Sequence, residues 1–173
     1  MKVTNMVIGG LVAAALMASV PAVAQTAKAE MKDAKGVSVG TIDLTETSEG
    51  VLLTVSLKGV PSGVHGFHIH AVGKCEGADF ATAGGHFNPA SHKHGLMSPQ
   101  GRHAGDLPNL HIPASGDLKA DVLAANVTLK AGQANSLFDQ DGSAVVIHDK
   151  ADDYKTDPAG DAGPRIACGV ISP

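Results

Sequence analysis

Short segments of alternating apolar and polar residues recur along most of the chain, and Gly-containing turns separate them. This period of two is typical of half-buried β-strands. No segment has the 3.6-residue period of a long amphipathic helix. The pattern predicts an all-β protein, an antiparallel sandwich or barrel. The expected strands are residues 36–45, 50–60, 66–72, 117–130, 143–150 and 164–172.

Two long segments, residues 73–116 and 149–163, interrupt this pattern and have little strand character. Loops of this length are uncommon in a compact domain and usually serve a function. Most of the nine histidines lie in or next to these two segments. We therefore expect them to cover a functional site.

The segment GFHIHAV places two histidines on one side of an expected strand. His68 and His70 share a face, while Phe67 and Ile69 take the other. His148 in SAVVIHDK repeats this arrangement. Either these imidazoles face solvent on the outer sheet surface, or they converge on a metal. Nitrogen-rich, roughly planar coordination suits Cu(II).

A second group of potential ligands lies in the first long loop, where His86, His94, His103 and Asp106 fall within 21 residues. Three imidazoles and one carboxylate can form a closed tetrahedral zinc site. A metal would also hold a loop that has no hydrophobic core of its own. The alternative is a solvated polar loop with scattered histidines, because spacing alone does not show that the side chains meet.

Length and charge narrow the classes of function. The 173 residues, 43% of them hydrophobic, suit one globular domain. The formal net charge is −4 and there is no basic run, which disfavours nucleic acid as a partner.

The N-terminus reads as a secretory signal peptide over residues 1–24. Lys2 precedes an apolar run at residues 6–20, and Ala22-Val23-Ala24 supplies a cleavage pattern. An uncleaved anchor is the alternative, although the run is shorter than the ~20 apolar residues of a membrane span. A second pattern, Ala27-Lys28-Ala29, leaves the site of cleavage open.

Export would place the remaining domain, residues 25–173, in an oxidising compartment. There Cys75 and Cys168, the only two cysteines, most simply form one disulfide. In the chain-entropy model a closure of this length contributes roughly 4 to 5 kcal/mol of stability.

Six motifs, taken in order, resemble those of the copper/zinc superoxide dismutase family, most closely its secreted bacterial branch. They are GFHIHAVGKC, GGHFNP, HKHG, RHAGDL, VVIHDKADDY and GPRIACGVI, and they span essentially all of the mature chain. The resemblance implies an antiparallel Greek-key β-sandwich or flattened barrel with two long functional loops. It also implies one copper and one zinc ion per subunit.

The resemblance further implies which residues bind the metals. His86 would bridge both ions as an imidazolate, a state that two cations can enforce. Asp152 would link a copper histidine to a zinc histidine, although the residues alone favour a solvated acidic pair with Asp153. The implied copper ligands are His68, His70, His86 and His148, and the implied zinc ligands are His86, His94, His103 and Asp106.

The implied activity is disproportionation of superoxide to dioxygen and hydrogen peroxide, protecting the cell envelope. Copper would alternate between Cu(II) and Cu(I), while His86 would take up a proton and pass it to the peroxide. Arg165 would line the copper channel and bind the anion, as a permanently charged guanidinium can. A surface arginine at a strand end is the alternative. Cys75 and Cys168 match the family's disulfide.

The expected location is the periplasm, and the expected partner is the superoxide anion, with no membrane contact after cleavage of the signal peptide. The bacterial branch is often dimeric, which makes a homodimer compatible with the resemblance. Two other functions stay open: a non-catalytic metal-binding protein, and a zinc hydrolase using Asp106 or Asp152 as base. The remaining histidines, His65, His92 and His111, are expected to be ordinary structural residues.

Overall fold

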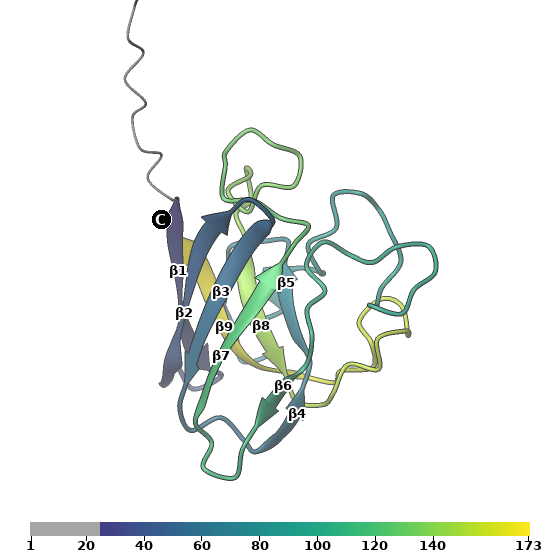
Figure 1. Ribbon diagram of the computed structural model, residues 1–173. Coiled ribbons are helices and arrows are strands. Elements are labelled where there is room, and N and C mark those ends of the chain that lie inside the picture. Colours follow the sequence, from purple (N-terminus) through teal and green to yellow (C-terminus); the bar gives the residue numbers. More distant parts are fainter. Residues whose placement is uncertain (1–24) are drawn as a thin grey trace, which may run out of the picture.

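The computed structural model describes residues 25–173, and these form nine strands and one short 3-10 helix (Figure 1). The elements are β1 (Thr26–Asp33), β2 (Ser38–Thr47), β3 (Gly50–Leu57), β4 (Gly63–His65), β5 (Phe67–His70), η1 (Ala81–Ala83), β6 (Leu110–Ile112), β7 (Leu118–Ala124), β8 (Ala144–His148) and β9 (Arg165–Ser172).

Seven of the strands form one curled antiparallel sheet in the order β5-β8-β9-β1-β2-β3-β7, and β4 pairs with β6 in a second, two-stranded sheet. Neighbours such as β3 and β7 are far apart in the chain, as Greek-key connections require. The predicted all-β antiparallel class is confirmed. The two long loops, between β5 and β6 and between β8 and β9, project on the same side of the sheet (Figure 1).

The main core fills the inside of this curled sheet. On β3 every second residue is buried, and Leu53, Val55 and Leu57 are almost fully hidden. With no tryptophan and one tyrosine in the sequence, aliphatic side chains supply most of the core, together with Phe67. The alternation seen in the sequence therefore corresponds to an apolar inner face and a polar outer face.

Strand β1 was not among the expected strands, yet it lies in the middle of the sheet. It pairs with β2 on one side and β9 on the other. Its buried face consists of Ala27, Ala29 and Met31. Two alanines give a weak apolar signal, which explains why the pattern did not reveal the strand. The expected signal peptide, residues 1–24, lies outside the described residues.

Several element boundaries also differ from expectation. The expected strand 117–130 ends at Ala124, and residues 125–143 form a third loop. The expected strand 66–72 is shorter, since β5 ends at His70, and residues 73–116 contain η1 and β6. Within the described residues, no helix is long and apolar enough to cross a membrane.

The third loop is anchored by the carboxylate of Glu46 on β2. One oxygen accepts a hydrogen bond from Thr128 Oγ1 at 2.8 Å, and the other accepts one from the backbone N–H of Leu129 at 2.7 Å. Lys130 Nζ lies 3.2 Å from the same carboxylate. Burial opposes ionisation, but these bonds outweigh it and lower the pKa of Glu46.

Replacing Glu46 with Ala is expected to lower the free energy of unfolding by about 1–3 kcal/mol, because the buried N–H of Leu129 loses its acceptor. Urea denaturation measures this. Because the pKa of Glu46 is lower in the folded state, the difference between the proteins is full above pH 4.5 and shrinks as the pH falls below it. Glu30→Ala, which removes an exposed ion pair with Lys28, is the control and should change stability by less than about 1 kcal/mol. An equal loss in both variants would contradict the anchoring role.

Candidate metal centre

Strand pairing brings His68, His70 and His148 together. Strand β5 lies beside β8 in antiparallel register, and all three rings project from the same side of these strands. On the opposite side, Phe67 and Ile147 enter the main core. The predicted alternation is therefore correct, but none of the three histidines faces solvent, because the long loops cover them.

The first long loop lies directly against β5 through backbone hydrogen bonds. The N–H of Phe87 donates to the carbonyl of Ile69 at 2.8 Å, and the N–H of Ile69 donates to the carbonyl of Gly105 at 2.9 Å. A Cβ at position 105 would lie 2.2 Å from the Ile69 oxygen, so only glycine permits this approach. This contact places His86 beside His70 and Asp106 beside His68.

Four imidazoles form the first donor set, hereafter the four-histidine set: His68, His70, His86 and His148. One nitrogen from each lies within 4.8 Å of the others. Nε2 of His70 and Nε2 of His148 are 3.4 Å apart. Nδ1 of His68 and Nε2 of His86 are buried, and neither has a hydrogen-bond partner among the described residues.

The outer nitrogens of this set are held by acceptors, which fixes the direction of each ring. Nε2 of His68 donates to Asp152 at 2.8 Å. Nδ1 of His70 donates to the carbonyl of Gly84 at 2.9 Å, and Nδ1 of His148 donates to the carbonyl of Gly163 at 3.1 Å. The lone pairs of the inner nitrogens therefore point at one another, which is how metal ligands are oriented.

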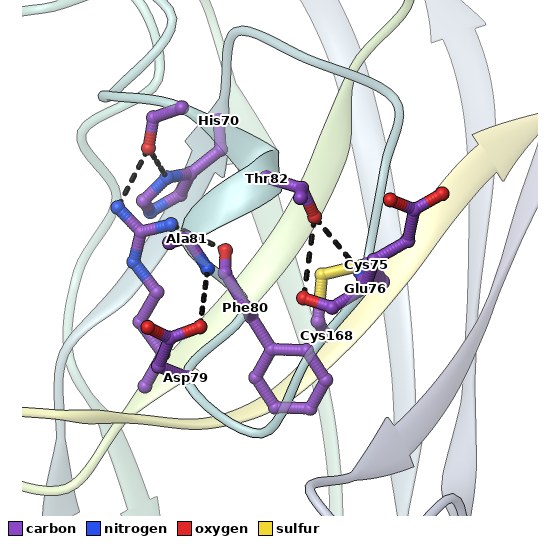
Figure 2. Close-up of a disulfide and its surroundings, with 10 residues drawn as sticks. His70, Cys75, Glu76, Asp79, Phe80, Ala81, Thr82 and Cys168 are labelled. Carbon is purple, nitrogen blue, oxygen red and sulfur yellow. Dashed lines mark hydrogen bonds between the residues drawn. A yellow bond between two sulfur atoms is a disulfide. The ribbon is translucent and has the colours of Figure 1, made fainter.

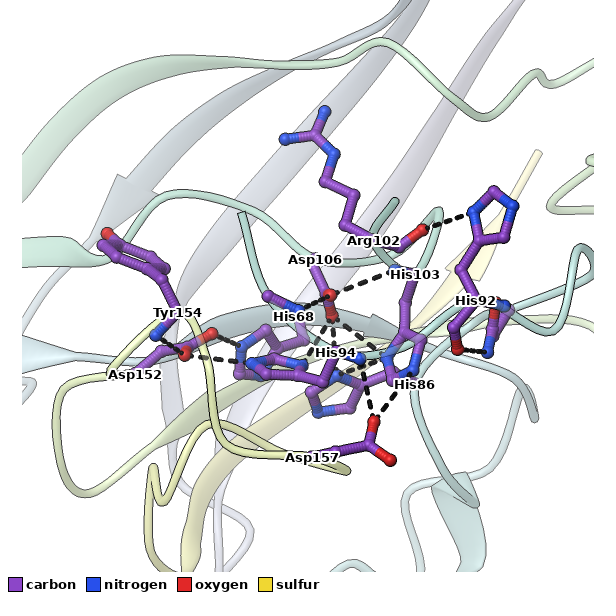
Figure 3. Close-up of polar contacts among 12 residues, drawn as sticks. His68, His86, His92, His94, Arg102, His103, Asp106, Asp152, Tyr154 and Asp157 are labelled. Atoms are coloured by element: carbon purple, nitrogen blue, oxygen red, sulfur yellow. Dashed lines mark hydrogen bonds and ion pairs between the residues drawn. The ribbon is translucent and has the colours of Figure 1, made fainter. Parts of the chain in front are cut away.

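The second donor set, hereafter the zinc-type set, consists of His86, His94, His103 and Asp106. Their donor atoms also lie within 4.8 Å of one another. Oδ1 of Asp106 is 2.8 Å from Nδ1 of His86, 3.1 Å from Nδ1 of His94 and 3.3 Å from Nδ1 of His103 (Figure 3). Nδ1 of His94 has no hydrogen-bond partner. His86 thus belongs to both sets, with Nδ1 in one and Nε2 in the other.

Asp152 connects the two sets. Its Oδ2 accepts from His68 at 2.8 Å, and its Oδ1 accepts from Nε2 of His94 at 3.0 Å. Asn109 holds the backbone of Asp152 on both sides: its amide donates to the Asp152 carbonyl at 2.9 Å, and its oxygen accepts from the Asp152 N–H at 2.8 Å. The acidic pair of the sequence is thus split, because Asp152 is buried whereas Asp153 is exposed.

Protonation states follow from this burial. Burial lowers the pKa of His68 to about 3 and that of His148 to about 4, so both are neutral at pH 7. Burial also opposes a charge on His94, but its contacts with Asp106 and Asp152 raise its pKa to about 9. Burial would raise the pKa of both carboxylates, yet the histidine hydrogen bonds hold them well below their usual range.

The donor chemistry fits two different metals. Four nitrogens suit copper, and three nitrogens with one carboxylate oxygen suit zinc. The buried ring nitrogens without partners support this fit, because such atoms are costly unless something binds them.

The disulfide between Cys75 and Cys168 is formed, with 5.7 Å between the Cα atoms, as the sequence predicts (Figure 2). It joins the first long loop to β9. Phe80 packs in the same small cluster as Cys168, on the outer side of the sheet. The segment around η1 is thereby fixed against the sheet.

The side chain of Arg165 is hydrogen-bonded to that segment around η1. Its Nη1 donates to the carbonyl of Phe80 and its Nη2 donates to the carbonyl of Gly84, both at 2.6 Å. The carbonyl of Gly84 also accepts from His70. One carbonyl therefore orients both the arginine and a member of the four-histidine set.

A cavity of about 320 Å³ opens onto the four-histidine set, and Arg165 forms part of its wall. A larger groove of about 810 Å³ lies beside the disulfide, but no histidine lines it. The smaller cavity is therefore the one that reaches the four-histidine set. Its lining includes His70, His86, His148, Arg165, Pro158 and Ala159.

Comparison with known proteins identifies the family. The model of the family described as copper/zinc superoxide dismutase matches residues 38–171. The chain belongs to this family. A superoxide dismutase [Cu-Zn] of Aquifex aeolicus is 49% identical over 144 residues, covering 83% of this chain and 85% of the relative. One of Caulobacter vibrioides is 46% identical over 148 residues, covering 84% and 85%. The cofactors of the family are copper and zinc.

Solved structures agree with this assignment. A double mutant of a superoxide dismutase-like protein from Bacillus subtilis has a TM-score of 0.82 and 42% identity, covering 84% of this chain and 97% of that one. The Cu/Zn superoxide dismutase from Brucella abortus has a TM-score of 0.69 and 28% identity, covering 86% and 100%. Such dismutase structures therefore share the fold of this chain.

The structure also shows positioning contacts that the sequence did not indicate. His65 is buried, and its nitrogens contact the carbonyls of His148 at 2.8 Å and Pro61 at 2.9 Å. It therefore supports the strand end that carries His148. His92 and His111 are exposed and belong to neither donor set. No spacing rule marks His65 or Asn109, because both act through backbone groups distant in the sequence.

Asp152→Ala is expected to weaken zinc binding by about 10- to 100-fold, because His94 loses the acceptor that orients its ring. Competition with a chromophoric chelator measures the affinity. Asp149→Ala is a matched control, since it removes an exposed carboxylate from the same loop. If both variants bind zinc as tightly as the original chain, Asp152 has no orienting role.

Proposed function

We propose that this chain disproportionates superoxide to dioxygen and hydrogen peroxide at a histidine-bridged copper/zinc centre. The observation that carries the proposal is the presence of two complete donor sets that share one ring, His86. Membership in the copper/zinc superoxide dismutase family supports the same activity.

The hydrogen bonds on the outer nitrogens support a particular choice of ligand atoms for each metal. Copper would be held by Nδ1 of His68 and by Nε2 of His70, His86 and His148. In His68, His70 and His148 the other ring nitrogen already donates to an acceptor. Zinc would be held by Nδ1 of His86, His94 and His103 and by Oδ1 of Asp106. His86 would then bridge the two ions.

Bound copper supplies reversible one-electron chemistry, so that one superoxide is oxidised to dioxygen and a second is reduced. The overall reaction consumes two protons, one for each oxygen atom of the peroxide. His86 lines the cavity and would deliver one of them from Nε2, while its Nδ1 stays against Asp106. Water supplies the other.

Arg165 provides the positive charge that an anionic substrate needs. The chain as a whole has a formal charge of −4, so attraction has to come from local potential in the cavity. Two donors of the guanidinium bond to carbonyls, and the group has further N–H donors that would serve the anion. The rigid support from Phe80 and Gly84 keeps this charge next to the four-histidine set.

The alternatives from the sequence are less well supported. A metal-binding protein without activity would not require Arg165 in the wall of the cavity beside His70 and His148. A zinc hydrolase needs an open coordination position, whereas the zinc-type set already offers four donors. Its proposed bases, Asp106 and Asp152, are both occupied by histidines.

Export and a periplasmic location are part of the same proposal, with residues 1–24 as a cleaved signal peptide that leaves the domain 25–173. The disulfide supports an oxidising compartment. Cleavage before Gln25 leaves β1 intact, whereas cleavage after Ala29 would remove half of a central strand. In that compartment the enzyme would protect the cell envelope from superoxide.

Superoxide decay, measured with copper and zinc content on the same purified sample, tests the activity directly. The rate is expected to rise in proportion to bound copper. His148→Ala removes one nitrogen of the four-histidine set and is expected to reduce the rate by more than about 100-fold. His111→Ala, an exposed histidine on β6, should leave it unchanged. Full loading with both metals and decay no faster than buffer would rule out the proposed activity.

Arg165→Ala is expected to lower kcat/KM for superoxide by roughly 10-fold or more, because the cavity loses its positive charge. The remaining rate should depend less steeply on salt. Arg165→Lys keeps a positive charge but not the two hydrogen bonds to carbonyls, and its kcat/KM is expected to lie between those of the original chain and Arg165→Ala. Rates measured across a range of ionic strength decide this, and an unchanged salt dependence in Arg165→Ala would refute the attraction by Arg165.

A further inference from the structure

Asp157 lies in the loop between β8 and β9, and its carboxylate reaches the loop between β5 and β6, which carries all four members of the zinc-type set (Figure 3). Its Oδ1 accepts a hydrogen bond from the backbone N–H of His94 at 2.8 Å. The same oxygen lies 4.0 Å from Nε2 of His103. Its Oδ2 forms an ion pair with Lys93 at 3.0 Å.

We infer that Asp157 is a positioning residue for zinc. Its hydrogen bond to His94 would link the loop that carries the zinc ligands to the wall of the cavity that Arg165 lines. The inference rests on the proposed function, in which His94 and His103 are zinc ligands. Asp157 itself belongs to neither donor set and is not a ligand.

The hydrogen bond from His94 completes the restraint of that residue. Its ring is fixed at Nε2 by Asp152, and its Nδ1 faces Asp106 at 3.1 Å. These two contacts fix the orientation of the His94 ring, but neither involves the His94 main chain. Asp157 supplies that restraint at the N–H of His94, in a loop where neighbouring residues such as Lys93 are exposed and contribute no core.

The two loops also meet next to this contact, so the restraint is part of a wider junction. The N–H of Met97 donates to the carbonyl of Tyr154 at 3.1 Å. A Cβ at Gly95 would lie 2.0 Å from the same Tyr154 oxygen, so the backbones approach as closely as glycine allows. Asp157 adds its hydrogen bond to a junction in which main-chain atoms and the side chain of Asp152 also take part.

The position of Asp157 in the chain connects this junction to the substrate. Pro158 and Ala159 follow it directly, and both line the cavity that Arg165 shares. A displacement of His94 on loss of zinc would therefore reach the cavity wall through Asp157, in addition to the contact of its ring with Asp152. Zinc binding would in this way set the position of this part of the cavity wall as well as the orientation of His86.

The hydrogen bond to the His94 N–H contributes more to this positioning than the negative charge of Asp157 does. The ion pair with Lys93 is between side chains that are 63% and 38% exposed, where solvent screens the attraction. The 4.0 Å distance to His103 is too long for a hydrogen bond. A neutral acceptor at position 157 should therefore preserve most of the effect, whereas a side chain with no acceptor should abolish it.

Zinc affinity of four variants, measured by chelator competition on the full mature chain, tests the inference. Asp157→Ala is expected to bind zinc about 10- to 100-fold more weakly. Asp157→Asn keeps an acceptor for the His94 N–H and is expected to stay within about fivefold of the original affinity. Lys93→Met, which removes only the ion pair, and Asp149→Ala, an exposed carboxylate of the same loop, should also stay within about fivefold.

The visible spectrum of Co²⁺ bound in place of zinc gives a second readout, because its d–d bands report the arrangement of the ligands. The bands are expected to shift in Asp157→Ala and to be restored in Asp157→Asn. Equal affinity and equal spectra for Asp157→Ala and the original chain would overturn the inference. Equal weakening in Asp157→Asn and Asp157→Ala would overturn the role of the hydrogen bond. Failure of the original chain to bind zinc would instead refute the proposed metal site itself.

Discussion

Six imidazole rings and two carboxylates are packed into one cluster that is largely closed to water, and this burial is the constraint on which the rest of the molecule depends. In such a place charged groups must be neutralised and polar atoms must have partners. The protein satisfies the outward-facing atoms with carbonyls, Asn109 and Asp152, and leaves several inward-facing nitrogens unpaired. Two cations at the centre would meet both requirements, and they would supply the cohesion that apolar side chains supply elsewhere in the fold.

The support around the centre is built from shared acceptors. Asp152 serves one ring from each donor set, and the carbonyl of Gly84 serves both His70 and Arg165. A shared acceptor makes the positions of its two donors interdependent. The geometry of the four-histidine set, the zinc-type set and the guanidinium of Arg165 is therefore one connected arrangement, and the disulfide fixes its outer end through the segment at Phe80.

Much of this could be predicted from the sequence, and the exceptions have physical reasons. The period-two pattern around His68, His70 and His148 correctly placed them opposite the core, because burial on one face of a strand enforces alternation. Strand β1 was missed because Ala27 and Ala29 are small and only weakly apolar. The roles of His65, Asn109 and Asp157 could not be seen, since each depends on a bond to a group 43 to 83 positions away: His65 to His148, Asn109 to Asp152, and Asp157 to His94. Local patterns contain no information about such partners.

The central place of β1 has a consequence for how the chain reaches this structure. Its partner β9 contains the final residues of the domain, and the pair Lys28 and Ser172 is separated by almost the whole sequence. Contacts between such distant residues are slow to form, because the entropy of closing a long loop opposes them until the end of folding. The same last strand carries Arg165 and Cys168. The sheet, the disulfide and the cavity wall thus all depend on this one long-range pairing, and loss of β9 would remove a strand, a cysteine and an arginine from them together.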